Sequence, residues 1–186
     1  MSAPDHASLG STPASASLPL VFVTVGTDHH PFHRLVRWVE GWLAAGAGQR
    51  ARCLVQFGTS ERPRLAEGRD YLPYAEMERE AADAIAVVCH GGPGSVMMAR
   101  WQGKKPIVVP RRRELGEHVD DHQLVFAARM AKEGELELVE NEARFRELLD
   151  EVLAGSQSLQ LSAGRAEMDE SLARFERLVN ELLATR

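Results

Sequence analysis

Residues 84–95 read AIAVVCHGGPGS, and this stretch decides which fold the sequence favours. Its apolar run, residues 84–89, ends in His90 and a glycine-rich turn, and further apolar residues follow Ser95. This order predicts a buried strand, a tight loop and the first turn of a helix. Such a junction directs backbone N–H groups and the positive end of a helix dipole at one point, which suits a phosphate. The stretch therefore predicts a nucleotide or diphosphate site in an α/β protein.

The same alternation of strands and helices extends along the chain. Strands are expected at residues 20–25, 53–57, 84–89, 106–109 and 136–139, with a further short strand around Tyr71. Helices are expected at residues 32–43, 75–82, 95–102, 117–132 and 141–153. The alternation predicts a Rossmann-like, mostly parallel sheet with helices on both faces. Ligands of such sheets bind at the carboxyl ends of strands, where Gly26-Thr27, Gly58-Thr59 and His90-Gly91-Gly92 fall.

The 186 residues suit one domain with flanking segments. Residues 1–18 are rich in Ala, Ser and Pro and do not resemble a signal peptide, so a disordered tail is expected. Residues 19–154 are expected to form the ligand-binding domain. Residues 163–186 should form an amphipathic helix with its apolar residues at helical spacing: Met168, Leu172, Phe175, Val179 and Leu182.

Composition excludes several classes of protein. The net charge of -5 argues against a general nucleic-acid binder, so no nucleic-acid partner is expected. The cysteines, Cys53 and Cys89, lie in apolar runs and should be buried and reduced. No apolar run approaches the ~20 residues needed to cross a bilayer. A cytoplasmic location is therefore expected.

The glycine loop has rival interpretations. HGGPG after a strand also occurs in α/β-hydrolases, but that fold needs a G-x-S-x-G nucleophile elbow, which this sequence lacks. A plain tight turn with Ser95 as helix cap explains the glycines but not His90. The fingerprints G-x-G-x-x-G and G-x-x-x-x-G-K-[ST] are absent, which disfavours NAD, FAD and P-loop chemistry.

Residues 110–123, PRRRELGEHVDDHQ, hold further candidates. The arginines at 111–113 suit a diphosphate, a partner surface or a solvated loop. His118 and His122 are four apart, as on one helix face, but the H-E-x-x-H pattern is not matched, so no metal is expected. Asp121, His122 and Gln123 suit hydrogen bonds to sugar hydroxyls.

Three histidines, His29, His30 and His33, flank the first loop. A polar entry to the helix is the favoured interpretation of all three. If a general base lies among them, His29 is the candidate.

Several motifs together resemble a known family, over about residues 20–153. They are residues 22–27 (FVTVGT), 56–58 (QFG), 90–95 (HGGPGS), 103–106 (GKKP), 116–118 (GEH) and 120–123 (DDHQ). The chain resembles the C-terminal, nucleotide-sugar-binding half of glycosyltransferase family 28. It is most similar to the small donor-binding subunit of two-subunit transferases, such as the cytosolic subunit of the dolichol-linked GlcNAc transferase and bacterial exopolysaccharide relatives. MurG is a fused relative.

The resemblance implies a fold and a set of binding residues. Residues 19–154 would be half of a GT-B fold that binds a UDP-sugar, with no metal and no cofactor. The donor diphosphate would lie on the loop formed by His90, Gly91, Gly92, Gly94 and Ser95, and Gly26 and Thr27 would line the cleft. Gln123, with Asp121 and His122, would contact the sugar. This sequence departs from the family at Met98, where many relatives carry a ribose-binding glutamate, and in the extra lysine before Pro106.

The resemblance also implies a reaction and a partner. The reaction would be inverting transfer from a UDP-sugar to a polyprenyl-diphosphate-linked acceptor in polysaccharide or glycolipid synthesis. A membrane-associated partner subunit would supply the acceptor-binding wall and hold this chain at the inner face of the membrane. Either that partner or His29 would supply the base. The C-terminal amphipathic helix would dock on the partner or on its own domain. The alternative is a non-catalytic nucleotide-sugar-binding or scaffold subunit.

Overall fold

The computed structural model describes residues 18–161 together with residues 170, 173–174, 176–177 and 180. The strands are β1 (Leu20–Thr24), β2 (Arg52–Gln56), β3 (Glu67–Arg69), β4 (Ala86–Cys89), β5 (Ile107–Val108) and β6 (Glu137–Leu138). The α-helices are α1 (His33–Ala44), α2 (Tyr74–Asp83), α3 (Pro93–Trp101), α4 (His122–Lys132) and α5 (Glu142–Leu153). Short 3₁₀ turns, η1 (Ala47–Gln49) and η2 (Arg113–Leu115), complete the elements. The segments expected as a disordered tail, residues 1–18, and as an amphipathic helix, residues 163–186, lie almost entirely outside the described residues.

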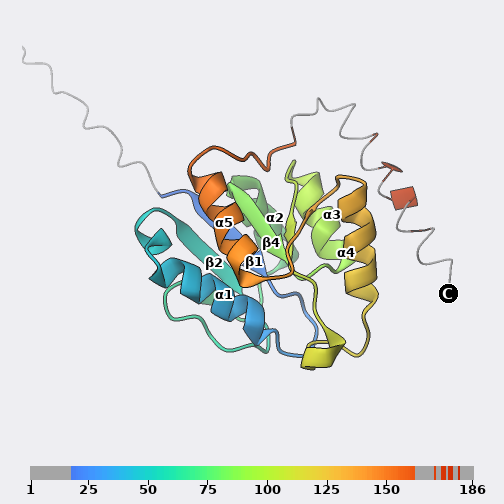
Figure 1. Ribbon diagram of the computed structural model, residues 1–186, viewed down its shortest axis with the longest axis horizontal. Coiled ribbons are helices and arrows are strands. Elements are labelled where there is room, and N and C mark those ends of the chain that lie inside the picture. The colour runs from blue at the N-terminus through green and yellow to red at the C-terminus, as the bar shows by residue number, and fades with distance from the viewer. Residues whose placement is uncertain (1–17, 162–169, 171–172, 175, 178–179, 181–186) are drawn as a thin grey trace, which may run out of the picture.

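The strands form one parallel sheet in the order β3-β2-β1-β4-β5-β6 (Figure 1). Val23 of β1 pairs with Val55 of β2 on one side and with Val88 of β4 on the other. Every residue of β1 and β4 is buried, as expected of apolar, β-branched strands that are covered on both faces. The α/β fold with a parallel sheet is therefore confirmed.

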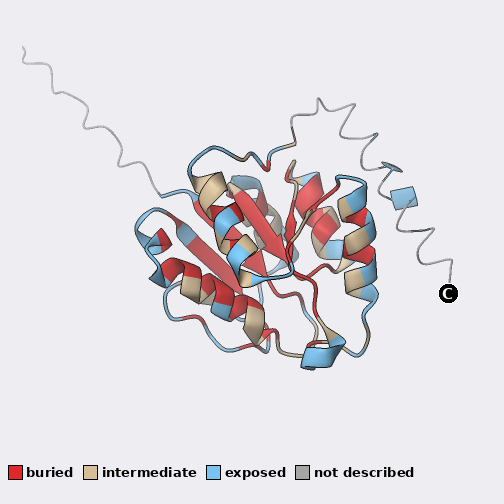
Figure 2. Cartoon of the chain, in the orientation of Figure 1, coloured by how far each residue is buried: buried red, intermediate tan, exposed pale blue. Residues whose placement is uncertain are grey.

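Helices cover both faces of the sheet, and the strands between them are largely buried (Figures 1 and 2). The side chains of β1 alternate between the two faces. Val21 and Val23 of β1 belong to the cluster that packs against α1 and α5. Leu20 and Phe22 point to the opposite face and pack with residues of α2 and α3, while α4 packs beyond them against β4 and β5. The core thus lies in two layers, and the loops at the carboxyl edge of the sheet remain available for a site.

Two local expectations are wrong, and one rival interpretation also fails. The helix expected over 117–132 begins only at His122. The side chain of Glu117 is buried and accepts hydrogen bonds from Arg34, and the residues just before it form η2. The short strand expected around Tyr71 lies earlier, at β3. Ser95 does not cap α3: Pro93 is its first residue and Gly92 its N-cap, without any side-chain capping hydrogen bond.

Within the described residues, none of the helices combines the length and the apolar character required to cross a bilayer.

Candidate functional site

A pocket of about 380 Å³ opens between the loop after β1 and the loop after β4. β1 and β4 are neighbours from which the strand order runs in opposite directions, so their two loops diverge and leave a crevice. Residues from both loops, and from β2, α2, α3 and α4, line the pocket: Gly26, Thr27, Asp28, Gln56, Met77, His90, Gly92, Pro93, Gly94, Ser95 and Gln123. The pocket lies where sequence reasoning placed the site.

Glycines allow the two loops to approach each other closely. Gly26 has φ +83°, and a Cβ there would lie 2.5 Å from Cε1 of the His90 ring. A Cβ on Gly92 would also overlap the His90 ring, at Nε2. Gly94 differs, because a Cβ at this position would meet no protein atom within 4 Å. The first two glycines therefore make room for His90, whereas Gly94 leaves open space beside the first turn of α3.

His90 is buried beneath the pocket. Burial, with a smaller contribution from the Arg111 charge, lowers the pKa of His90 to about 3. The ring is therefore neutral at physiological pH. Its Nδ1 atom is buried and has no hydrogen-bond partner among the described residues. A buried polar atom of this kind usually finds a partner, which a water or a ligand in the pocket could supply.

Two glutamine side chains add buried amide oxygens, which are hydrogen-bond acceptors. The amide Nε2 of Gln56 donates to the carbonyl of Gly26 at 3.2 Å, and this bond fixes the orientation of the amide. Its Oε1 atom is buried and finds no partner within the described part of the chain. The Oε1 atom of Gln123, at the start of α4, is in the same condition. The pocket is thus lined by two glutamines whose buried amide oxygens can accept hydrogen bonds from hydroxyl groups of a ligand.

Arg111 connects the loop after β5 to the loop after β1. Its guanidinium is fully buried and donates to the carbonyls of Val25 (2.7 Å), His30 (2.7 Å) and Glu117 (2.8 Å). It also lies 4.9 Å from the centre of the Phe32 ring. The solvated-loop interpretation is therefore wrong for Arg111, which shapes the site from beneath.

Asp28 lies at the rim of the pocket, between three histidines. Burial alone would raise the pKa of Asp28, but hydrogen bonds from the backbone and ring of His30, and the Arg111 charge, lower it to about 2. Nε2 of His118 lies 3.3 Å from the second carboxylate oxygen. His29 is 85% exposed at its side chain and does not line the pocket.

The expected site residues divide into two groups. Gly26, Thr27, Gly92, Gly94 and Ser95 line the pocket with His90 and Gln123. Gly91, Asp121 and His122 do not. Gly91 is buried against Val108, and Asp121 and His122 lie exposed at the start of α4, where Asp121 accepts a hydrogen bond from the backbone of Arg113. His118 and His122 do not share a helix face, because α4 begins after His118.

Sequence reasoning did not assign four of the lining residues: Asp28, Gln56, Met77 and Pro93. Gln56 carried a signal, since a polar side chain that ends an apolar strand has to be satisfied or used. Met77 carried none, because an apolar residue on an amphipathic helix is ordinarily part of the core.

Met98 and one of the two lysines before Pro106 are buried. Met98 is 1% exposed and packs in the core against α2, outside the pocket lining. Lys104 is also buried and donates to the carbonyl of Ala84 at 2.7 Å and to Oε1 of Gln160 at 2.9 Å. Lys104 therefore ties the chain after α3 to two other segments.

A larger hollow of about 480 Å³ lies between α1 and η2. Its buried charged groups are already paired, because Glu117 accepts two hydrogen bonds from Arg34, at 2.9 and 2.7 Å. It therefore presents fewer unused polar atoms than the pocket beside His90, which is the stronger candidate site.

Comparisons with known proteins identify the family and the fold of the chain. Residues 20–182 match the glycosyltransferase family 28 C-terminal domain. No match is found among curated proteins. Among solved structures, the kitacinnamycin glycotransferase matches with TM-score 0.57 and 17% identity, over 98% of this chain and 44% of that one. The calicheamicin glycosyltransferase CalG4 matches with TM-score 0.56 and 18% identity, over 94% and 42%.

MurG of Acinetobacter baumannii matches with TM-score 0.52 and 14% identity, over 88% of this chain and 51% of that one. The chain thus spans about half, or less, of the length of these structures. Its fold is that of the C-terminal half of GT-B glycosyltransferases. Since the family match extends over most of the sequence, the chain belongs to glycosyltransferase family 28, of which it carries the C-terminal domain.

Proposed function

We propose that this chain binds a UDP-sugar in the pocket between the loops after β1 and β4, as the donor-binding subunit of an inverting glycosyltransferase. The observation that carries the proposal is a set of buried polar atoms that lack a partner within the described part of the chain, on residues that line the pocket: Nδ1 of His90, Oε1 of Gln56 and Oε1 of Gln123. A nucleotide sugar is rich in hydroxyl donors, and its binding would satisfy such atoms.

The diphosphate would lie at the start of α3. The helix dipole favours an anion at this end. Because the N–H of Ser95 already donates to the Gly92 carbonyl at 3.1 Å, the first-turn N–H groups of Gly92 and Gly94 would meet the phosphate. Pro93 occupies the first helical position, where an N–H group is not needed. The open space beside Gly94 lets a phosphate approach the backbone.

The sugar and the ribose would then meet the glutamines. A ligand hydroxyl would donate a hydrogen bond to a buried amide oxygen that otherwise has no partner. A ligand without that hydroxyl would leave the oxygen unpaired and would bind more weakly. Gln123 is our first choice for the transferred hexose, as the family resemblance implies. Asp121 and His122 would reach the sugar only after a movement of the start of α4.

The reaction would be a direct displacement at the anomeric carbon. The acceptor hydroxyl oxygen forms the new bond, the bond to UDP breaks, and the acceptor proton passes to a base. The charge on the departing UDP would be stabilised by the N-terminus of α3, so we expect no cofactor. We assign the base to the partner, since His29 lies outside the pocket lining.

The proposal also includes an acceptor and a partner subunit. We propose a polyprenyl-diphosphate-linked acceptor, bound mainly by a membrane-associated partner subunit that closes the open side of the pocket. This assignment rests on the family resemblance. The location would be cytoplasmic, at the inner face of the membrane, and the product would serve polysaccharide or glycolipid synthesis.

A non-catalytic nucleotide-sugar-binding or scaffold subunit is the alternative. The buried Met98 favours it, because a thioether in the core cannot bond a ribose hydroxyl in the way that the glutamate of relatives would. Transfer of sugar to a lipid-linked acceptor, measured after co-expression with the candidate partner, separates the two functions. Binding without transfer in that reconstituted pair would support the scaffold.

Calorimetric titration with UDP and UDP-sugars tests the donor site. Gly94→Leu is the informative variant, because leucine suits a helix and would project into open space, while blocking the approach of a phosphate. We expect unchanged thermal stability and at least about tenfold weaker UDP binding. Ala82→Leu, at an exposed position of α2, is the matched control and should bind UDP as the wild type does. Equal UDP affinity of Gly94→Leu and the control would refute the diphosphate position.

A further inference from the structure

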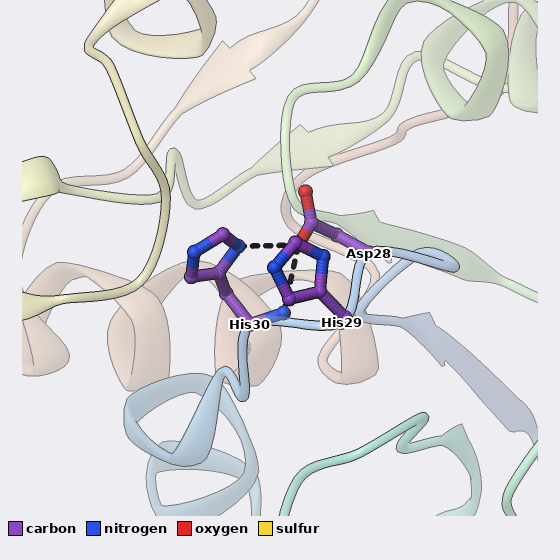
Figure 3. A group of neighbouring side chains, drawn as sticks. All are labelled: Asp28, His29 and His30. Carbon is purple, nitrogen blue, oxygen red and sulfur yellow. Dashed lines mark hydrogen bonds and ion pairs between the residues drawn. The ribbon is translucent and has the colours of Figure 1, made fainter.

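A cluster of histidine and aspartate side chains lies at the outer rim of the pocket, where the loop after β1 turns toward α1 (Figure 3). Asp28, His29 and His30 each present one ligand atom, and these atoms lie within 4.8 Å of one another. Oδ1 of Asp28 is 2.7 Å from Nδ1 of His30 and 3.5 Å from Nδ1 of His29. Two imidazole nitrogens thus lie close to one carboxylate oxygen.

The loop before α4 adds a fourth group from the other side. Nε2 of His118 is 3.3 Å from Oδ2 of Asp28. Nδ1 of the same ring lies 3.2 Å from Oδ1 of Asp120. A histidine that binds a metal through one nitrogen commonly directs the other at a carboxylate, which orients the ring. Asp120 stands in that position behind His118.

We propose that Asp28, His29, His30 and His118 form a binding site for a divalent transition metal, with Zn²⁺ as the best fit. Imidazole and carboxylate ligands in this combination suit Zn²⁺, Co²⁺ or Ni²⁺, whereas Mg²⁺ and Ca²⁺ prefer oxygen ligands alone. Zinc–ligand bonds of about 2.0–2.2 Å hold tetrahedral ligand atoms roughly 3.3–3.5 Å apart. The distances from Nδ1 of His29 to Oδ1 of Asp28 and from Nε2 of His118 to Oδ2 lie in this range, and His118 would turn toward Oδ1 to complete the set around one ion.

Small side-chain changes would complete the site. His30 now bonds Asp28 directly, and a rotation of its ring would admit the ion between them. His29 is 85% exposed, so an ion can approach from solvent. Nδ1 of His118 now accepts a hydrogen bond from the backbone N–H of Asp120 at 3.3 Å. To bind through Nε2, the ring would shift its proton to Nδ1, which would then donate to the Asp120 carboxylate 3.2 Å away. None of these changes requires a movement of the sheet.

The spacing of His118 and His122 had not favoured a metal, and the proposed set is a different one. His122 pairs instead with Asp120, at 2.7 Å, and stays outside the ligand set. His118 joins the set because the parallel sheet brings the loops after β1 and β5 together, and Arg111 binds carbonyls of both. The proposed site shares Asp28 with the pocket lining, but none of its ligand atoms is one of the unpaired polar atoms on which the donor proposal rests.

Zinc titration of the untagged chain, after treatment with EDTA, tests the site. We expect one equivalent bound with about micromolar affinity or tighter, and a rise in unfolding temperature with added Zn²⁺. Co²⁺ should give the intense visible absorption of a tetrahedral site. His29→Gln and His118→Gln should each weaken Zn²⁺ binding about tenfold or more, because each removes one ligand.

His33→Gln is the matched control. It removes an imidazole whose Nδ1 accepts a hydrogen bond from the backbone of Glu61, outside the cluster. It should bind Zn²⁺ as the wild type does. Since His29 is exposed, His29→Gln should fold normally and keep the test interpretable.

Three results would overturn the proposal. They are Zn²⁺ binding no tighter than about millimolar, equal loss of affinity in His33→Gln, and a Co²⁺ spectrum like that of the hydrated ion. UDP titration of the metal-free chain is read separately. Failure of the metal site would therefore leave the donor proposal untouched, and the reverse also holds.

Discussion

Replacing Arg111 with methionine should show that this side chain supports the site from within and does not bind the ligand. Methionine keeps the length and apolar part of the side chain, but it removes every donor. The carbonyls of Val25, His30 and Glu117 would then lose donors that lie 2.7–2.8 Å away. The change separates the two roles that an arginine in this loop can have.

The size of the effect follows from those three bonds. A buried carbonyl left without a donor costs about 1–3 kcal/mol, so three of them amount to roughly 3–9 kcal/mol. Burial lowers the pKa of Arg111, because it disfavours the charged form. Removing the guanidinium removes this desolvation cost and offsets part of the loss. We therefore expect a net loss of about 3–5 kcal/mol, typical of breaking one side of a buried ionic contact.

Urea unfolding, followed by circular dichroism, measures this loss, and UDP titration is performed on the same protein. Arg112→Met is the matched control, since Arg112 is 29% exposed and its contact with Glu114 is 3.3 Å long. The control should lose no more than about 1 kcal/mol. If Arg111→Met instead loses less than about 1 kcal/mol and no longer binds UDP, Arg111 contacts the ligand and our interpretation fails.

The remaining predictions concern three residues in or beneath the pocket. Gly26→Ala should destabilise the fold more than Gly134→Ala in thermal unfolding, because both glycines have a similar positive φ but only Gly26 abuts the His90 ring; equal losses would show that the ring gives way. Burial lowers the pKa of His90 from 6.5 to about 3, so unfolding takes up a proton in that window. As the pH is lowered from about 6.5 to about 3, the free energy of unfolding should therefore fall by about 1.4 kcal/mol per pH unit. His90→Gln should lack this fall, and identical pH profiles of the two proteins would contradict the prediction. Met98→Glu should cost about 3 kcal/mol or more in urea unfolding at neutral pH, whereas Met98→Leu should cost under about 1.5 kcal/mol; a stable glutamate variant would mean that the side chain reaches the pocket.

Patterns with one physical cause were predictable from the sequence. The apolar, β-branched run at 20–25 has to be a strand covered on both faces, and the structure has β1 there. The glycine loop after residue 89 has to turn sharply into a helix, and α3 follows it. Because the carboxyl ends of parallel strands share one edge, Gly26 and His90 could also be expected to meet.

Features that depend on distant contacts were not predictable. Residues 117–121 precede a helix and could have extended it by one turn. The buried ion pair between Glu117 and Arg34, 83 positions away, stabilises the observed loop instead. Arg111 reads as one of three loop arginines, and only the folded chain distinguishes it. Met98 stands where a ligand contact was expected by family likeness, and the packing against α2 uses it instead.

The buried guanidinium of Arg111 has one more consequence, for motion. Arg111 donates hydrogen bonds to the carbonyls of Val25 and His30 in one loop and of Glu117 in the other. Neither loop can therefore move away without breaking its bonds to this guanidinium. The two loops should therefore open as a single cooperative unit in native-state hydrogen exchange. A ligand held at Gly26 and Thr27 would then slow amide exchange around Glu117, in a segment that it does not touch.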